Sequence, residues 1–554
     1  MALKVPRAGG PTLFKEGYKQ LSGVEEAVLR NIQAVTELSH IVRTSFGPNG
    51  RNKMVVNHLG RLFVTSDAAT IIREMEVVHP AAKLLVFASQ QQEAEMGDAT
   101  NLVLILAGEL LRRAEALITL GLHPTEIVQG FELARERTLE QLEKLSIATL
   151  SAPPTQESLA LALRPVLASK QFGSENVLAP LIAQAVLLVV PPSQDALHDF
   201  SVDNVRVVKI MGGSLAQSRV VRGMVMGRVP EGAVTSASAA KVAVFACGLD
   251  VSQTETKGTV LLHNASELQA FSRGEEVQLE RSLQEIADAG VKVVVVQSAV
   301  GELALHYLNR LHILVLKVSS KFDVQRLCRL LGATPLARVG APLPEETGWI
   351  DSVETTEIGG DRVTVFRQED GLPGGDASPR LATIVLRGAT TSYLDDIERT
   401  IDDGVNAVKA LMRDPRLVPG AGATEIELSR RVFEYGERTP GLNQHAIKKF
   451  AEALEVVPRT LAETSGLDAP DVVSRLNAKH AQPDNSDVGV DVDGGSDGTF
   501  STVDAQVFDV LVAKHWAIRY ATNAAIDVLK VDSIIMSKPA GIKAPGRNPN
   551  WDED

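Results

Sequence analysis

A change in the hydrophobic pattern along the chain constrains its fold more than any other feature. Residues 22–145 and 391–531 carry the apolar spacing of helices, as in VEEAVLRNIQAVTELSHIVRTS. Between them, short β-branched runs alternate with helical stretches, and the runs span 205–210, 240–247, 291–298 and 312–319. A chain of this kind most simply leaves a helical domain, builds an insert and returns to finish the first domain. The sequence therefore predicts a multidomain α and α/β fold, in which an α/β insert splits a helical domain.

Length and composition agree with this nested arrangement. The 554 residues exceed what one hydrophobic core usually supports, so about three domains are expected. Hydrophobic residues make up 44% of the chain and charged residues 23%, which is typical of a folded protein. The net charge of -13 comes without a dense run of Lys and Arg, so a nucleic-acid partner is not expected.

Cysteine usage and hydropathy indicate the cytoplasm. Cys247 and Cys328 lie far apart without CxxC spacing, so they are expected to be reduced core residues rather than a disulfide or a zinc site. The first 17 residues lack the apolar core of a signal peptide, and no run of about 18 apolar residues offers a membrane span. The longest apolar stretch, 177–192, carries Gln184 and ends at two prolines, which favours a buried helix.

Two short strand-like pieces stand near the ends of the chain, at 53–57 and 531–537. They can pair with each other, or a neighbouring subunit can complete an exposed strand edge. Oligomerisation is therefore one of two alternatives for these pieces.

Acidic residues at predicted helix starts admit two interpretations. Asp98 in GDATN and Asp67 in VTSDAAT each precede an apolar helix, where a carboxylate commonly caps the free N–H groups. Alternatively, a helix N-terminus can bind phosphate, and a carboxylate there can bind the accompanying magnesium. Asp403 lies opposite the apolar stripe of its helix, so its pattern alone predicts a solvated position.

Glycine-bearing turns are the other candidates for a ligand site. FGPNG (46–50) ends one helix and VPGAG (418–422) opens another, and glycines there let the backbone approach a ligand closely, although ordinary helix ends also use them. The chain has no P-loop, HExxH, GxSxG or kinase signature, and 420–422 lacks the third glycine and the preceding strand of a dinucleotide fingerprint. A bound nucleotide would need a different cradle.

Taken in order, several segments resemble the group II chaperonins, which are ring-forming, ATP-driven protein-folding complexes. The segments are TSFGPNGRNKM, VTSDAATII, EVVHPAAKLL, GDATN, LRGATTSYLDDIERTIDD, VPGAGATEIEL and AKHWAIRYATNAAIDVL. The resemblance covers essentially the whole chain and is closest to a subunit of the eukaryotic cytosolic complex. It implies an ATPase chaperone in a hetero-oligomeric double ring of paralogous subunits, which encloses unfolded clients such as actin and tubulin.

The resemblance also implies three domains in nested order. Residues 1–150 and 406–554 would form an equatorial domain for ATP binding and ring contacts. Residues 151–217 and 372–405 would form an intermediate hinge domain. Residues 218–371 would form the α/β apical domain, which binds clients and carries the lid protrusion.

Carried over position by position, the resemblance implies a site for ATP or ADP with Mg²⁺. Asp98 would coordinate the magnesium ion. Asp67 and Asp403 would flank the attacking water, with Asp403 as the general base. The other nucleotide-binding residues would be Ser45, Gly47 and Pro48 along the phosphates, Thr100 and Asn101 at the helix start, Lys170 toward the γ-phosphate, Gly420 and Gly422 near the ribose, and Gly489 and Asp509 near adenine and sugar.

Several positions depart from the family pattern. Ala99 and Ala421 replace glycines, Asn101 replaces a threonine, and Asp402 and Gly404 flank the catalytic acid in place of His and Ala. An alanine held at positive φ costs on the order of 1 kcal/mol, and the Ala99 methyl would also crowd the phosphates. Bound nucleotide with slow hydrolysis or restricted exchange is therefore expected. Two alternatives remain: a structural ring subunit that holds nucleotide with little turnover, and a free-standing enzyme with a small-molecule ligand in the insert.

Overall fold

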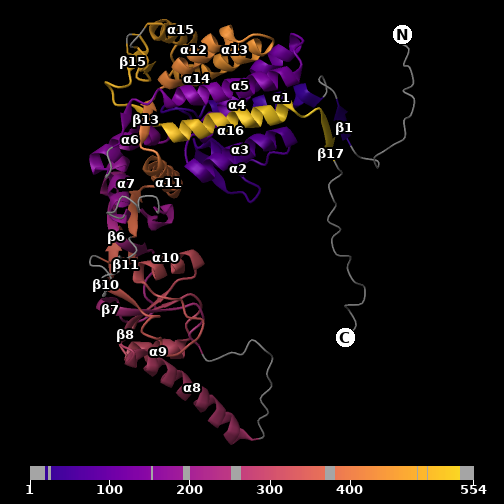
Figure 1. Ribbon diagram of the computed structural model, residues 1–554. Helices are drawn as coiled ribbons and strands as arrows, with labels where there is room; N and C mark the ends of the chain where they lie inside the picture. The colour runs from indigo at the N-terminus through magenta and orange to yellow at the C-terminus, as the bar shows by residue number, and fades with distance from the viewer. Residues whose placement is uncertain are drawn as a thin grey trace, which may run out of the picture.

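The two helical halves of the sequence pack into one body at one end of the molecule (Figure 1). The computed structural model describes residues 19–22, 27–150, 154–190, 200–250, 264–368, 381–482, 485–495 and 497–536. One hydrophobic core contains buried residues from both halves, so neither half completes this body alone. We call this body the helical tier, and its helices are α1 (Leu29–Arg43), α2 (Ala68–Glu74), α3 (Pro80–Met96), α4 (Thr100–Thr119), α5 (Pro124–Glu143), α12 (Ala423–Arg438), α13 (Asn443–Leu454), α14 (Val456–Thr464), α15 (Ala469–His480) and α16 (Leu511–Leu529).

Helix α4 forms the centre of the helical tier because its sequence is apolar on nearly every face. Every residue from Leu102 to Leu111 is buried. A helix of this kind must be covered on all sides, and α1, α3, α13 and α16 pack around it. Phe131 of α5 and Phe450 of α13 form an edge-to-face pair with ring centroids 5.8 Å apart, which joins the two halves of the chain.

The strand-like pieces near the chain ends do not pair with each other, which excludes the first of the two alternatives. β2 (Lys53–Val56) forms a hairpin with β3 (Leu62–Thr65). β17 (Ser533–Met536) instead pairs with β1 (Lys19–Ser22). Each piece therefore pairs along one edge with another strand of the same chain. These partner strands are short, and their sequences gave no clear strand signal.

A three-stranded sheet corrects the expectation that no strand precedes the turn at 420–422. β13 (Arg416–Pro419) lies between β16 (Phe508–Val510) and β4 (Ala148–Thr149). A strand thus does precede the turn at 420–422, although the turn still lacks the third glycine of a dinucleotide fingerprint. Nearby, β14 (Val488–Val490) pairs with β15 (Thr499–Ser501).

A second body, the middle tier, connects the helical tier to the rest of the molecule (Figure 1). Its core contains the apolar stripe of α11 and the buried face of α7, so the buried helix predicted at 177–192 is confirmed up to Val189, while residues 191 and 192 lie outside the described residues. The elements of the middle tier are α6 (Gln156–Ala168), α7 (Glu175–Val189), η3 (Val202–Asn204), β5 (Val205–Met211), η4 (Leu215–Gln217), β12 (Ala382–Gly388) and α11 (Thr391–Arg413).

The third body, the sheet tier, is the predicted α/β insert. Along β8, Val293 and Val295 belong to one core, while Val294 and Val296 belong to the other, as the two-residue period of a strand requires. Helix α10 covers the first face, and α8 and α9 cover the second. Its elements are β6 (Arg219–Met226), β7 (Ser236–Phe245), α8 (Ala265–Asp288), β8 (Val291–Val296), α9 (Glu302–Arg310), β9 (Leu314–Lys317), α10 (Lys321–Leu331), β10 (Gly348–Ile358) and β11 (Asp361–Arg367).

One strand links the middle and sheet tiers. The strands run in the order β5-β12-β6-β11-β10-β7-β8-β9. Residues Arg219–Arg222 of β6 pair with β12 of the middle tier, and Gly223–Met226 pair with β11 of the sheet tier. Gly223 has φ +121°, and a Cβ there would lie 2.0 Å from the carbonyl oxygen of Phe366. Only glycine fits where β6 changes partners.

The predicted multidomain α and α/β fold, with a helical body split by an α/β insert, is confirmed. Of the two free cysteines, Cys328 is buried as expected, whereas Cys247 is only partly buried. In the part of the chain that the structure describes, no helix combines the length and apolarity needed to cross a membrane.

Candidate functional site

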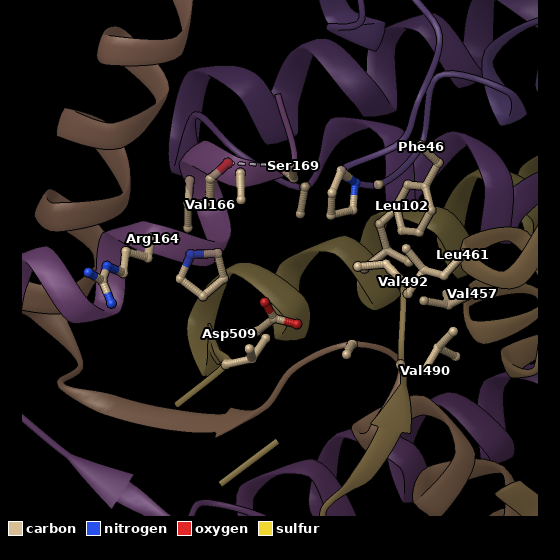
Figure 2. Close-up of a pocket in the computed structure, with 18 of the residues that line it drawn as sticks. Phe46, Leu102, Arg164, Val166, Ser169, Val457, Leu461, Val490, Val492 and Asp509 are labelled. Carbon is tan, nitrogen blue, oxygen red and sulfur yellow. Dashed lines mark hydrogen bonds between the residues drawn. The ribbon is translucent and has the colours of Figure 1, made fainter. Parts of the chain in front are cut away.

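A cavity of about 570 Å³ lies between the helical tier and the end of α6 of the middle tier, together with the loop that follows α6. Figure 2 shows the carboxylate of Asp509 pointing into it, with Val490, Val457 and Leu461 along one side. The predicted residues that line the cavity are Gly47, Pro48, Asp98, Ala99, Thr100, Asn101, Lys170, Gly422 and Asp509. Those that do not line it are Ser45, Asp67, Asp403, Gly420 and Gly489, and their positions are described below.

The N-terminus of α4 reaches the cavity without a side-chain cap. Gly97, with φ 72°, is the C-cap residue of α3, and Ala99, with φ 62°, is the N-cap residue of α4. Asp98 interacts with the backbone N–H of Ala99 and caps no N–H of the first helical turn, so the capping interpretation of Asp98 is wrong. The N–H groups that open α4, together with the positive end of its dipole, can therefore bind an anion such as phosphate.

The Asp98 carboxylate stands beside this helix terminus. Burial raises the pKa of Asp98, and Lys170 offsets only part of that effect. The fully buried amide of Gln92 donates hydrogen bonds to the carbonyl oxygens of Asp98, at 2.9 Å, and of Ala513, at 3.2 Å. Gln92 thus fixes the backbone that carries Asp98. A carboxylate that is costly to ionise becomes much more stable when a cation binds next to it.

Lys170 brings the other two predicted acids together. Its Nζ lies 2.8 Å from Asp67 Oδ1 and 2.6 Å from Asp403 Oδ2, so one ammonium connects α2 of the helical tier with α11 of the middle tier. The Asp403 side chain is only 14% exposed. The solvated position predicted for Asp403 is therefore wrong, because the loop after α6 covers the polar face of α11.

The charges of this cluster are strongly coupled. Burial raises the pKa of Asp67, but the charge and hydrogen bond of Lys170 and the hydrogen bonds of Thr70 outweigh it and hold this pKa well below its ordinary value. Burial keeps the pKa of Asp403 well above its ordinary value despite Lys170. Burial lowers the pKa of Lys170, but Asp403, Asp67 and Asp98 together raise it well above its ordinary value. Lys170 and Asp67 are thus charged, and Asp403 is the group that accepts a proton most readily.

Asp67 also caps α2, as one of its two interpretations predicted. Its Oδ2 accepts a hydrogen bond of 3.0 Å from the backbone N–H of Thr70. The hydroxyl of Thr100 donates to the other oxygen, Oδ1, at 3.4 Å. Asp67 therefore has a structural role and a position within the cluster at the same time.

Asn101 and Ser45 connect segments around the cavity. The Asn101 oxygen accepts from the backbone N–H of Ala68 at 2.9 Å, and its nitrogen donates to the Ser45 carbonyl at 3.3 Å. Ser45 is buried, and its hydroxyl donates to the Arg51 carbonyl. The Asn101 side chain holds the turn that carries Gly47 against the start of α2, and the Ser45 hydroxyl closes that turn, so neither presents a free donor to the cavity.

The turn that opens α12 shapes the opposite wall. Ala421 has φ 50° and Gly422 has φ 80°. Gly420 packs against Val507, to whose carbonyl it donates at 3.0 Å. Gly489 lies behind the turn, because a Cβ on it would stand 2.8 Å from the Ala421 methyl. Gly420 and Gly489 therefore allow close backbone packing and do not reach the cavity themselves.

Sequence reasoning missed Lys514 and Glu425, two buried residues that form an ionic cluster with the predicted Asp509 in the cavity wall. Lys514 Nζ lies 2.6 Å from Glu425 Oε1 and 2.9 Å from Asp509 Oδ2, and all three residues line the cavity. The available signal was a Lys within the buried face of α16 and a Glu directly after the glycine turn. Charged residues at such positions are rarely buried without a partner.

The chain is similar to known proteins over its whole length. The sequence model of the TCP-1/cpn60 chaperonin family matches residues 38–539. A Schizosaccharomyces pombe protein named "Probable T-complex protein 1 subunit theta" is 57% identical, and proteins named "T-complex protein 1 subunit theta" from Saccharomyces cerevisiae and Homo sapiens are 52% and 49% identical. Each similarity covers 100% of this chain and 100% of the relative.

Proposed function

The chain belongs to the TCP-1/cpn60 chaperonin family, and on that premise we propose that its cavity binds ATP with Mg²⁺ and hydrolyses the ATP to drive protein folding. The observation that carries the proposal is the Lys170 cluster. One ammonium contacts Asp67 and Asp403, at 2.8 and 2.6 Å, beside the uncapped N-terminus of α4. Two carboxylates from different tiers that can orient and deprotonate a water, next to an anion-binding helix end, suit phosphoryl transfer to water.

The shape of the cavity supports a nucleotide. Its volume of about 570 Å³ is within the usual range for small-molecule sites. The helix terminus and the turn at Gly47 suit the phosphates, since Gly47 has φ +83° and a Cβ there would lie 2.6 Å from Leu461. Val457, Leu461 and Val490 form an apolar wall on which a base can lie.

The donor set also fits magnesium. In the described part of the chain no group of three or more His, Cys, Asp or Glu residues could hold a metal ion by itself. Mg²⁺ commonly binds one or two carboxylates, water and substrate phosphates instead of an all-protein cage. Asp98 would hold the ion, which would neutralise charge on the phosphates.

Asp403 would act as the general base. Its raised pKa makes it a better proton acceptor than an ordinary carboxylate, and it would take a proton from the water that attacks the γ-phosphate. Asp67 would orient that water, and Lys170 would stabilise negative charge on the transferred group. Because Asp403 belongs to the middle tier, movement of that tier toward the helical tier would control hydrolysis.

The wider biological role follows from the family. The relatives' names describe subunits of a T-complex protein, and we infer that this chain likewise forms a cytosolic double ring with paralogous subunits and folds clients such as actin and tubulin. Residues 1–150 and 406–554 would be its equatorial domain, 151–217 and 372–405 its intermediate domain, and 218–371 its apical domain. Size-exclusion mass distinguishes this from a free enzyme, which would elute as a small oligomer rather than a ring complex.

Single-turnover ATP hydrolysis in the assembled complex tests the proposal, with the substitution made in this subunit only. Asp403→Ala is expected to remove a resolvable share of turnover. Asp395→Ala is the matched control, because Asp395 lies on the same helix but pairs with exposed Lys209. Equal rates for Asp403→Ala and the wild type would contradict the role of Asp403.

A subunit that holds nucleotide with little turnover is the second candidate. It is favoured by the two alanines in the left-handed region, Ala99 with φ 62° and Ala421 with φ 50°. Both residues line the cavity at positions where the family pattern has glycine. In this case Asp403→Ala leaves turnover unchanged, while Ala99→Gly raises it.

A further inference from the structure

A second cavity, of about 420 Å³, lies in the helical tier between the end of α1, the turn at 44–51 and α14. No residue that lines it also lines the cavity described above, which we call the first cavity. The turn nevertheless contributes to both, because Gly47 and Pro48 line the first cavity, whereas Asn49 and Arg51 line the second. The two cavities are therefore separate sites that share one turn.

The lining of the second cavity carries an excess of positive charge. Arg43 forms an ion pair with Glu463, with 2.9 Å between Nη2 and Oε2. The side chains of Arg51 and His40 also line the cavity, and neither forms an ion pair or a hydrogen bond with the residues that the structure describes. One carboxylate thus faces two guanidinium groups and an imidazole. A ligand that enters this cavity meets a guanidinium without a counterion.

Several hydrogen-bond donors at the second cavity have no acceptor. Arg43 Nε is buried and has no hydrogen-bond partner in the described part of the chain. The Thr44 hydroxyl accepts from Lys53 Nζ, so its own O–H is left to donate. A buried donor without an acceptor costs free energy, and an oxyanion that reaches Arg43 would remove that cost. The planar fork of a guanidinium also matches the oxygens of such an anion.

The arrangement of these donors favours phosphate over carboxylate. The donors come from α1 and from the turn at 44–51, so they approach the cavity from different segments. A phosphate group offers three or more acceptor oxygens, whereas a carboxylate offers two. The volume of about 420 Å³ is within the usual range for small-molecule sites and leaves room for more than one phosphate group.

Backbone and side-chain hydrogen bonds connect the second cavity to the first. The turn is closed by a hydrogen bond of 2.8 Å from the Arg51 N–H to the Thr44 carbonyl. Asn49 Nδ2 donates to the carbonyl of Val492, at 3.4 Å, and Val492 lines the first cavity. A ligand bound to Arg51 therefore acts on a closed turn whose Gly47 faces the first cavity.

We propose that the second cavity binds a small phosphate-bearing anion through Arg43 and Arg51, and that the bound anion fixes the turn at 44–51. Glu463 already contacts Arg43, so its carboxylate competes with the anion for that guanidinium. The site is separate from the first cavity, and the inference does not depend on the nucleotide proposed there.

Chemical modification of arginine in the assembled complex tests this inference. Arg51 is exposed, and p-hydroxyphenylglyoxal modifies guanidinium groups at a rate that peptide mass spectrometry follows for this subunit alone. Inorganic phosphate and pyrophosphate are the probes, added with excess ADP to occupy the proposed nucleotide sites, and sodium chloride of equal ionic strength is the control. At about ten times its Kd, a probe is expected to slow modification of Arg51 by about tenfold. Arg281 on α8, whose side chain is 82% exposed, should react at an unchanged rate.

Two substitutions break the same ion pair with opposite expected effects on anion binding. Arg43→Met removes a donor and is expected to raise the protecting concentration by about tenfold, as for one charge-assisted hydrogen bond. Glu463→Gln removes the competing carboxylate and is expected to lower that concentration. A purely structural role of the Arg43–Glu463 pair would shift both variants in the same direction, and that result would overturn the inference.

Two further results would also overturn it. Equal protection of Arg51 by phosphate and by sodium chloride would show charge screening rather than a binding site. An Arg51 that does not react in the complex without added anion would show that a neighbouring subunit closes the cavity. Slower modification with pyrophosphate than with phosphate would support the site and indicate that it holds two phosphate groups.

Discussion

Lys170 and Asp403 lie 233 positions apart in the sequence, yet the Nζ of one is 2.6 Å from Oδ2 of the other. Lys170 follows α6 and Asp403 lies in α11, and Lys170 also contacts Asp67 of the helical tier. The tiers of the molecule thus meet through buried charge at the cavity. This contact makes the stability of the tier interface and the chemistry of the site depend on the same side chains.

Replacing Lys170 with Met is expected to destabilise the chain by about 3 kcal/mol, because it leaves two buried carboxylates without their cation. Denaturant unfolding, followed at the first transition, measures the effect. Lys144→Met is the control, since Lys144 forms an exposed pair with Glu140 and is expected to cost less than about 1 kcal/mol. Similar losses for the two variants would show that the Lys170 cluster contributes no more than a surface pair.

Ala99→Gly is expected to stabilise the chain by about 1 kcal/mol, because glycine adopts φ 62° without steric strain, and to raise single-turnover ATP hydrolysis. Thermal unfolding and hydrolysis rates are measured together. Ala239→Gly is the matched control: Ala239 has φ 45° but lies on β7, away from the cavity, so it should change stability alone. A rate increase with Ala239→Gly would contradict an effect of the methyl group at the phosphates.

Gly422→Ala is expected to weaken nucleotide binding as well as stability. Gly422 has φ +80°, and an added Cβ would lie 2.9 Å from Pro458 Cβ, so the turn beside the cavity must shift. Gly441→Ala controls for the backbone strain alone, because Gly441 has φ +89° and open space around it. We expect about 1 kcal/mol of destabilisation from strain in the control and a larger loss for Gly422→Ala. ATP competition photolabelling checks the binding; equal affinities for the two variants would contradict a role of this turn.

The lowered pKa of Glu427 predicts that acid destabilises the helical tier. Burial raises the pKa of Glu427, but hydrogen bonds from His480, Arg430 and Arg431 outweigh it and lower the pKa to about 2. A carboxyl with a lowered pKa stabilises the fold fully above its ordinary pKa of 4.5, and this stability is lost as the pH falls from there toward about 2. The loss is on the order of 3 kcal/mol.

Denaturant midpoints of unfolding, measured from pH 6 to pH 3, check this loss of stability. Glu427→Gln should be less stable than wild type at pH 6, and the gap should narrow as the pH falls. Glu140→Gln, at an exposed pair, is the comparison and should show almost no gap. A gap for Glu427→Gln that stays constant across this range would contradict the pKa assigned to Glu427.

The sequence predicted what depends on local pattern. Helical periodicity identified the split helical tier. For Asp67, capping of a helix was one of the two interpretations that the sequence offered, and the structure has it at the N-cap of α2. The pattern within one segment could not show where the polar face of a helix packs against another tier. For this reason Asp403 was predicted to be solvated. The pattern likewise could not reveal that the partner of β17 is a strand at residues 19–22. Lys514 escaped notice because its partners, Glu425 and Asp509, come from distant segments.

The shared strand β6 has a mechanical consequence. The middle and sheet tiers are joined by continuous backbone hydrogen bonds through Arg219–Met226, and the partner strand changes at Gly223. A sheet resists stretching and sliding far more than twisting, because only twisting leaves each ladder hydrogen bond intact. We therefore expect the sheet tier to rotate about the axis of β6 when the middle tier moves. A displacement of α11 at the cavity would then reach α8, at the far end of the molecule, as a rotation.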